Sequence, residues 1–170
     1  MKILTFINKR DSFLLLFLTI FALGLDQASK LLVIKRFIYN PEPIELLPFF
    51  KIVLLLNQGV SFSFLKEIDY RVLLIISFLA LLIAILMIAS LFRNSPFKMV
   101  LALSLLIGSS LGNIIDRFRY KGVVDFLLVH YNDFMFPIFN LADIMLTLCA
   151  MILIYEIIFN KKNVQKSKLK

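Results

Sequence analysis

The sequence predicts an all-α membrane protein, a bundle of four transmembrane helices with a small extended β-element and a short loop on the outer surface. Three observations predict it. Of the 170 residues, 61% are hydrophobic, above the roughly 45–50% of a soluble domain, and the mean hydropathy is +0.92. Four apolar runs each approach the length of about 20 residues that crosses a bilayer as a helix. Polar residues within the runs lie mostly toward one side of the membrane.

We expect a single integral membrane domain over residues 1–170, with outer loops at 37–71 and 119–136 and a basic, disordered cytoplasmic tail at 161–170. The predicted transmembrane helices are about 13–34, 72–92, 99–118 and 137–159. A cleaved signal peptide is the alternative for the first run, because Lys9 and Arg10 precede it. No small-x-small cleavage site follows, so we expect an uncleaved helix.

The charges predict the topology. Four spans place both termini on one side, which then carries ten basic residues and two acidic residues. The other side carries nine of each. Because basic residues accumulate in cytoplasmic segments, we expect both termini in the cytoplasm. The net charge of +8 is therefore a topology signal and not a nucleic-acid patch.

The outer loops contain extended segments. Pro41, Pro43 and Pro48 disfavour a helix after the first span. The stretch 49–56 is apolar and β-branched, and an Asn-Gln-Gly turn signal follows it. A second such stretch, 122–129, either pairs with the first or lies against the bilayer.

Cysteine and histidine limit the possible chemistry. The single Cys149 cannot form an intramolecular disulfide, and the single His130 excludes a His-cluster metal site. We expect no metal or cofactor, contacts with membrane lipid, and a monomer.

Polar residues from three helices and two loops are predicted to meet at the outer end of the bundle. A charged side chain at membrane depth costs roughly 2.5–3.5 kcal/mol, so such residues are candidates for function. Helical spacing places three pairs each on one helix face. The candidates are Asp26 with Lys30, Asn113 with Arg117, Asn140 with Asp143, and Asn57, Asp116 and Asp125.

Structural interpretations compete for several of these residues. Asp26 and Lys30 fit a structural ion pair as well as a substrate contact, and Asp116 fits an ion pair with a neighbouring arginine. Arg117, Arg119 and Lys121 fit lipid phosphates, an interpretation that we favour for the last two. Small residues of the third helix favour close helix packing; they are Gly108, Ser109, Ser110 and Gly112.

For Asp125 and Asp143 we favour chemistry. Two carboxylates held close at low dielectric do not both ionise readily, so one keeps a proton. The ionised carboxylate then takes a proton from water while the other polarises a carbonyl, which is amide hydrolysis. A continuous helix would separate the two residues by about 27 Å. The loop with Asn132, Asp133 and Pro137 must therefore double back.

A small transporter or proton-conducting bundle is the alternative function. It predicts ionisable residues across the whole membrane, yet the second helix has none between Arg71 and Arg93, and the fourth has Glu156 near its inner end. A non-enzymatic scaffold leaves the one-sided cluster without a reason.

Five stretches in order resemble the bacterial prolipoprotein signal peptidase (signal peptidase II) family, an intramembrane aspartic peptidase family with four transmembrane helices. They are DQASK at 26–30, NQGVSF at 57–62, GNIIDR at 112–117, VVDF at 123–126 and FPIFNLAD at 136–143. The resemblance covers nearly the whole chain between the termini. It implies a small β-cradle formed by the extended outer segments.

The resemblance also implies roles for the residues. Asp125 and Asp143 correspond to the catalytic pair. Site-lining or substrate-binding roles fall to Asn57, Gly59, Asn113, Arg117 and Asn140, and supporting roles to Asp26, Lys30 and Asp116. The implied substrate is a diacylglyceryl-modified prolipoprotein, cut just before its lipidated lipobox cysteine near the outer surface.

Overall fold

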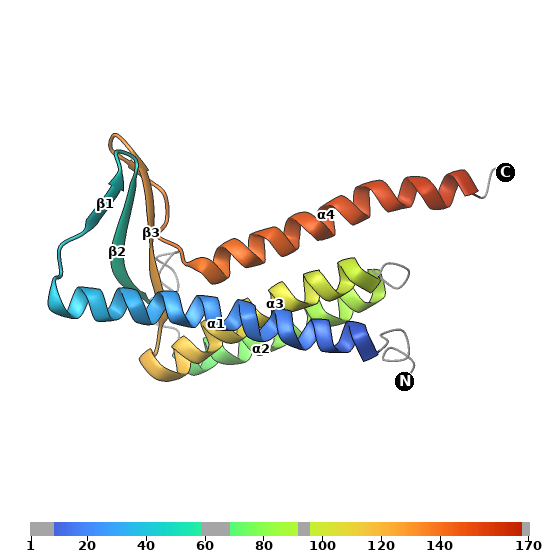
Figure 1. The fold of residues 1–170 in the computed structure, drawn as a ribbon, viewed down its shortest axis with the longest axis horizontal. Helices are drawn as coiled ribbons and strands as arrows, with labels where there is room; N and C mark the ends of the chain where they lie inside the picture. The colour runs from blue at the N-terminus through green and yellow to red at the C-terminus, as the bar shows by residue number, and fades with distance from the viewer. Residues whose placement is uncertain (1–8, 59–68, 92–95, 168–170) are drawn as a thin grey trace.

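The computed structural model describes residues 9–58, 69–91 and 96–167. Within these residues four helices and a four-stranded antiparallel sheet are formed, so the predicted fold class is confirmed (Figure 1). Each helix is long and apolar enough to cross a membrane. In chain order the elements are α1 (Lys9–Tyr39), β1 (Ile44–Leu47), β2 (Phe50–Asn57), α2 (Tyr70–Leu91), α3 (Pro96–Tyr120), β3 (Val123–Tyr131), β4 (Phe134–Met135) and α4 (Leu141–Ser167).

Helix α3 is the centre of the bundle. In its membrane-spanning stretch 61% of the residues are buried, against 11%, 11% and 17% in α1, α2 and α4. The apolar core forms where α2 and α4 pack on α3, around Leu81, Leu103 and Cys149. The other three helices keep large apolar side chains exposed, as lipid-facing helices do.

Small residues on α3 allow α1 to approach closely. A Cβ on Gly108 would lie 2.8 Å from both the Ala22 Cβ and the Thr19 carbonyl oxygen, and a Cβ on Gly112 would overlap the Asp26 carboxylate. Gly108 and Gly112 are four residues apart and therefore share one face of α3. The predicted small-residue packing is thus found, and it joins α3 to α1.

The two predicted extended stretches pair with each other. Strands β2 and β3 are antiparallel, with Leu56 opposite Val124 and Asn57 opposite Val123. The sheet order is β1-β2-β3-β4, and the sheet stands at one end of the bundle (Figure 1). The edge strands β1 and β4 were not predicted, because a strand of four residues beside prolines and one of two residues carry little periodic signal.

The chain doubles back after β3, as the sequence required. Asn132 adopts a φ of 50°, a conformation that asparagine tolerates, and the turn places Tyr131 opposite Phe134. The returning segment then pairs with β3 again: Phe139 accepts from the amides of Phe126 and Leu127 and donates to the Leu127 carbonyl at 3.1 Å.

Several helix boundaries differ from the prediction, and three of the differences have a physical explanation. Helix α4 begins at Leu141 and not at residue 137, because the preceding residues pair with β3. Helix α1 continues to Tyr39, since the prolines that end it start at Pro41. Helix α4 also continues to Ser167, through the tail that was expected to be disordered; its lysine and glutamine residues are good helix formers.

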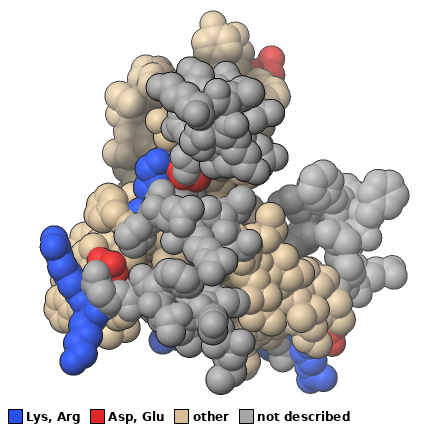
Figure 2. All heavy atoms as spheres, turned by 90° about the vertical axis from the view of Figure 1, so that its right-hand side faces the viewer, with Lys and Arg blue, Asp and Glu red and all other residues tan. Residues whose placement is uncertain are grey.

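Helix α1 begins and α4 ends at the same end of the molecule, opposite the sheet (Figure 1). An ion pair of 2.7 Å between Lys98 and the buried Glu156 joins α3 to α4 toward this end. Figure 2 looks onto this end and shows the lysines and arginines of the described residues in separate patches.

The close contact between α1 and α3 predicts the effect of one added methyl group. Gly108→Ala should lower the free energy of unfolding by about 1–3 kcal/mol, because the new Cβ overlaps Ala22 and the Thr19 carbonyl. Gly24→Ala on α1 is the matched control. It meets no atom within 4 Å and should be neutral or stabilising by up to about 1 kcal/mol. Thermal unfolding in detergent compares the two, and equal stabilities would contradict the close contact.

Candidate active site

Asp125 is the third residue of strand β3 and is 2% exposed. Each of its carboxylate oxygens accepts one hydrogen bond from a side-chain amide. Asn57, at the end of β2, donates to Oδ2 at 2.8 Å, and Asn140 donates to Oδ1 at 2.6 Å. The pairing of β2 with β3 therefore brings Asn57 to Asp125, and the return of the chain after β4 brings Asn140 to it.

Asp143 lies in the first turn of α4, where it forms a reciprocal cap with Asn140. The Asn140 side-chain oxygen accepts from the Asp143 amide, and the Asp143 Oδ2 accepts from the Asn140 amide, both at 3.1 Å. This is the arrangement of a capping box, with Asn140 as the N-cap residue. It explains the spacing of three residues between the amide and the carboxylate.

Asn140 thus contacts both aspartates, and the two carboxylates interact electrostatically. Burial raises the pKa of Asp125 from 3.8 to about 6. The amides of Asn57 and Asn140 oppose this rise by stabilising the ionised form, while the negative charge of Asp143 adds to it. The environments differ, since Asp143 stands at a helix N-terminus, which favours negative charge.

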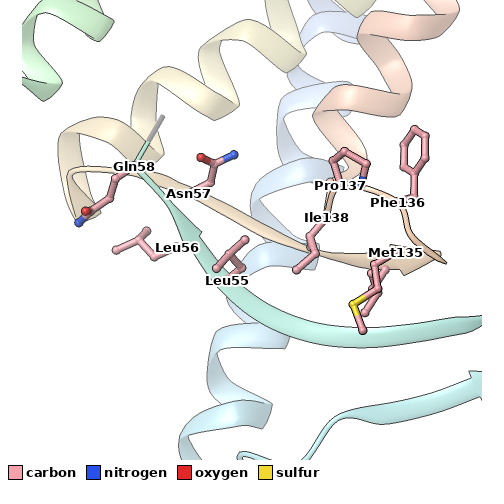
Figure 3. Close-up of a pocket in the computed structure, with 9 residues that line it drawn as sticks. Leu55, Leu56, Asn57, Gln58, Met135, Phe136, Pro137 and Ile138 are labelled. Carbon is pink, nitrogen blue, oxygen red and sulfur yellow. The ribbon is translucent and has the colours of Figure 1, made fainter. Parts of the chain in front are cut away.

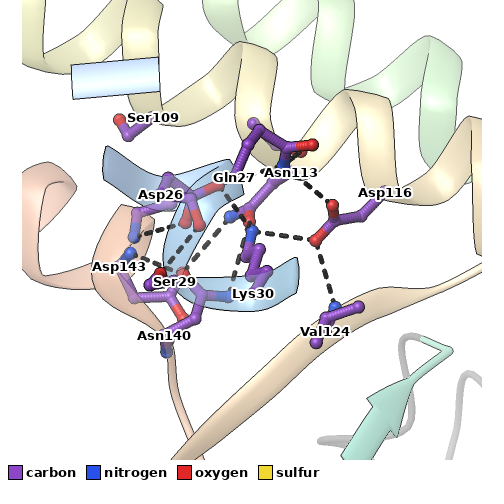
Figure 4. A network of polar contacts seen from close by, with 12 residues as sticks. Asp26, Gln27, Ser29, Lys30, Ser109, Asn113, Asp116, Val124, Asn140 and Asp143 are labelled. Atoms are coloured by element: carbon purple, nitrogen blue, oxygen red, sulfur yellow. Dashed lines mark hydrogen bonds and ion pairs between the residues drawn. The ribbon is translucent and has the colours of Figure 1, made fainter. Parts of the chain in front are cut away.

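A buried ammonium group, that of Lys30, lies between Asp26 and Asp116 (Figure 4). Lys30, 1% exposed, forms ion pairs of 2.8 Å with Asp26 and with Asp116, both equally buried. Of the two sequence interpretations for Asp26 and Lys30, the structural ion pair is the one found. Asp116 pairs with Lys30, not with the arginine that was considered.

Asn113 and Arg117 complete the site from α3. The Asn113 amide donates to Asp143 Oδ1 at 3.4 Å, and its oxygen accepts from Lys30 at 2.8 Å. Arg117 is half-buried, donates to the Asn113 carbonyl at 3.3 Å, and is attracted to the charges of both Asp125 and Asp143. Gly59 lies outside the described residues.

Sequence analysis missed the role of Gln27. Its side-chain amide donates to Asp116 Oδ1 at 3.0 Å and to the Gly112 carbonyl at 3.3 Å, which ties α1 to α3 beside the ion pairs. The sequence signal for this role was the position of a polar residue, Gln27, in a membrane span next to Asp26. The exposed Arg119 donates to the Gln27 oxygen at 3.4 Å.

An apolar groove of about 510 Å³ opens beside the site (Figure 3). The end of β2 and the segment that follows β4 line it, with Leu55, Leu56, Met135 and Ile138 among the apolar side chains. Asn57 also lines the groove, so a group bound there would lie next to the amide that holds Asp125.

Comparison with known proteins bears directly on this arrangement. A family model described as signal peptidase (SPase) II matches residues 18–159, a range that includes every described residue of the site. The chain belongs to the signal peptidase II family. Together with four helices able to span a bilayer, membership makes this a multi-pass bacterial membrane protein and a peptidase.

Individual members of the signal peptidase II family are similar over most of their length. A lipoprotein signal peptidase of Clostridium tetani is 38% identical over 137 residues, which cover 79% of this chain and 85% of that protein. One of Bartonella tribocorum is 38% identical over 154 residues, covering 88% and 89%. A bacterial membrane enzyme solved by the in meso method at 2.3 Å resolution is 26% identical, with a TM-score of 0.65 over 88% of this chain and 90% of that chain.

In this member of the signal peptidase II family, the reciprocal cap predicts a difference between two substitutions of Asn140. Asn140→Ser keeps an oxygen that accepts the Asp143 amide, whereas Asn140→Ala removes it. Loss of an N-cap costs about 1 kcal/mol, so the alanine variant should be less stable than the serine variant by about that amount. Thermal unfolding of the two variants in one detergent measures the difference. Equal unfolding temperatures would mean that the cap does not stabilise α4.

Proposed function

We propose that this protein is an intramembrane aspartic endopeptidase that removes the signal peptide from diacylglyceryl-modified prolipoproteins by cleaving just before the lipidated lipobox cysteine. The observation that carries this proposal is the arrangement of Asp125 and Asp143. Two carboxylates come from different elements, interact electrostatically, and are held by one shared asparagine. Membership of the signal peptidase II family supports the substrate class.

The different environments of the two aspartates assign their roles. Asp125, whose pKa burial raises to about 6, holds the shared proton. Asp143, at the N-terminus of α4, acts as the base and takes a proton from a water molecule as the water oxygen bonds to the scissile carbonyl carbon. Asp125 donates its hydrogen bond to the carbonyl oxygen, which becomes negatively charged. Asp143 then gives the proton that it took from water to the leaving nitrogen, and the C–N bond breaks to release an amine and a carboxylic acid.

Amide donors surround the two carboxylates of the dyad. Asn113, Asn140 and Asn57 each direct an amide N–H toward one of the two carboxylates. Such donors fix the orientation of each carboxylate before substrate binds, and preorganisation of this kind lowers the barrier without reorganisation during the reaction. Arg117 adds positive charge near both carboxylates.

The groove beside Asn57 supports a lipid-modified substrate. Its lining is mostly apolar, and burial of acyl chain there is favourable by about 0.8 kcal/mol for each CH₂ group. The exposed apolar side chains of α1, α2 and α4 support a position of these helices in lipid, from which a diacylglyceryl group would reach the groove without passing through water.

We further propose that the protein lies in the cytoplasmic (inner) membrane with both termini in the cytoplasm and acts as a monomer. The excess of basic residues at the end where α1 begins and α4 ends supports this orientation. The site lies at the opposite end of the helices, beside the sheet, which corresponds to the outer surface.

Substitution of either aspartate tests the dyad. Asp125→Asn and Asp143→Asn keep the side-chain size and remove the carboxylate, so each should lower cleavage of a purified diacylglyceryl-modified prolipoprotein by at least about 10³-fold. Mass spectrometry of the products locates the cut. Asp133→Asn is the matched control, because Asp133 is exposed in the turn after β3, and it should keep wild-type activity.

Near-normal activity of either dyad variant would make that aspartate structural and overturn the mechanism. If the wild-type protein does not cleave the substrate while it is folded, a small transporter or proton-conducting protein becomes the better interpretation.

The role of Asp125 predicts a pH dependence. Asp125 must be protonated, so activity should fall as pH rises through about 6. Asn57 stabilises the ionised form and thereby lowers the pKa of Asp125. Asn57→Leu should therefore move the falling limb of kcat/KM to higher pH, by about one pH unit if the lost hydrogen bond is worth about 1.5 kcal/mol.

The pH profiles of wild type and variant measure this shift. Gln58→Leu is the control, because it removes the amide of the next residue along the chain and should leave the midpoint of the limb unchanged. A shift of the Asn57→Leu limb to lower pH would contradict the role of Asp125.

A further inference from the structure

The contacts of Lys30 connect the α1–α3 interface to both aspartates of the dyad. Its ammonium group is almost completely buried and has three acceptors, each at 2.8 Å: Asp26 Oδ2, Asp116 Oδ2 and Asn113 Oδ1. An ammonium group has three protons to donate, so these acceptors account for all of them. Each acceptor in turn contacts a different part of the site (Figure 4).

The two carboxylates bind the backbone at equivalent positions. Asp26 Oδ1 accepts from the amide of Ala142, the residue before Asp143, and Asp116 Oδ2 accepts from the amide of Val124, the residue before Asp125. Both distances are 3.1 Å. One ammonium group therefore lies between two carboxylates that each hold the backbone one residue before an aspartate of the dyad.

The third contact sets the orientation of the Asn113 amide. An ammonium group cannot accept a hydrogen bond, so the Asn113 oxygen must face Lys30. The NH₂ group then faces Asp143, where it donates to Oδ1. Lys30 thereby determines which group of Asn113 faces Asp143.

Stability alone is a weak reason for this arrangement. Burying an ammonium group and two carboxylates carries a large desolvation cost, and apolar residues of similar volume often stabilise a protein as well or better. What apolar residues cannot reproduce is the link between Ala142 and Val124, which requires acceptors for both amides and a common donor.

We propose that Lys30 is a positioning residue that sets the separation of the two catalytic carboxylates through Asp26 and Asp116, and orients Asp143 through Asn113. The proposal rests on the function proposed above. Its consequence is kinetic, since a displacement of about 1 Å at a reacting centre can lower the rate about 100-fold. Loss of the link should therefore lower kcat and leave substrate affinity largely unchanged.

The test compares variants of the full-length protein with a diacylglyceryl-modified prolipoprotein as substrate. The triple variant Lys30→Met, Asp26→Asn, Asp116→Asn removes the ammonium and both negative charges together, so no unpaired charge remains among these three residues. We expect a folded protein whose kcat is about 100-fold lower and whose KM changes by less than about threefold. Lys35→Met is the matched control on the same helix, where the side chain is exposed, and it should keep wild-type kinetics.

The single variants Asp26→Asn and Asp116→Asn provide a second measurement that does not depend on the folding of the triple variant. Each leaves Lys30 one carboxylate partner, and each keeps an oxygen that accepts the backbone amide. We expect kcat to fall by about 10-fold or more in both, again with little change in KM.

Three outcomes would overturn the role of Lys30: wild-type kcat in the triple variant, wild-type kcat in both single variants, or a fall in kcat that matches the fall in the folded fraction. Asp125→Asn is measured in parallel. If that variant is inactive while the triple variant is active, the role of Lys30 fails and the proposed function stands. If Asp125→Asn is active, the proposed function itself fails.

Discussion

The hydrogen bonds between Phe139 and strand β3 fix the point at which the chain enters its last helix. Phe139 bonds to Phe126 and Leu127 through its backbone, so the next residue, Asn140, lies beside Asp125. Helix α4 then starts with Asn140 as its cap, and Asp143 follows within the first turn. A helix that began at residue 137 would have no such contact with β3. The arrangement of both carboxylates thus depends on a short stretch of β-pairing outside the helices.

The buried charges depend on a second constraint, the close approach of α1 and α3. Gly112 leaves room for the Asp26 carboxylate, since any Cβ there would overlap it. With the helices at this distance, Lys30 reaches Asp116 and Asn113 on the neighbouring helix. An isolated charge in this position would be costly, whereas a fully hydrogen-bonded cluster is tolerated. Gly112, which the sequence pattern assigns to helix packing, is therefore also needed for the polar network to form.

Much of this structure could be predicted from the sequence, for identifiable reasons. Length and hydropathy predicted four helices, and β-branched stretches beside turn residues predicted the pair of strands that became β2 and β3. The polar cluster was predicted because charged residues in a membrane span need partners. The particular partner of each polar residue could not be predicted. That Asp116 pairs with Lys30, and that Gln27 joins α1 to α3, follows from side-chain directions that depend on the distance between helices.

The start of α4 could not be predicted for a related reason. Residues 137–140 are apolar enough to continue a helix on composition, apart from the proline, and their pairing with β3 is a contact distant in sequence. A spacing of three residues, as between Asn140 and Asp143, is the pattern of a capping box and equally that of a pair of site residues at the start of a helix. Sequence alone does not separate the two.

The reciprocal cap between Asn140 and Asp143 has a consequence for folding. Forming the first turn of a helix is the unfavourable step in helix formation, and here the carboxylate that stabilises this turn is also half of the proposed dyad. The first turn of α4 therefore also sets the position of Asp143. A chain in which this turn has not formed lacks the Asn140 cap that holds Asp143 beside Asp125.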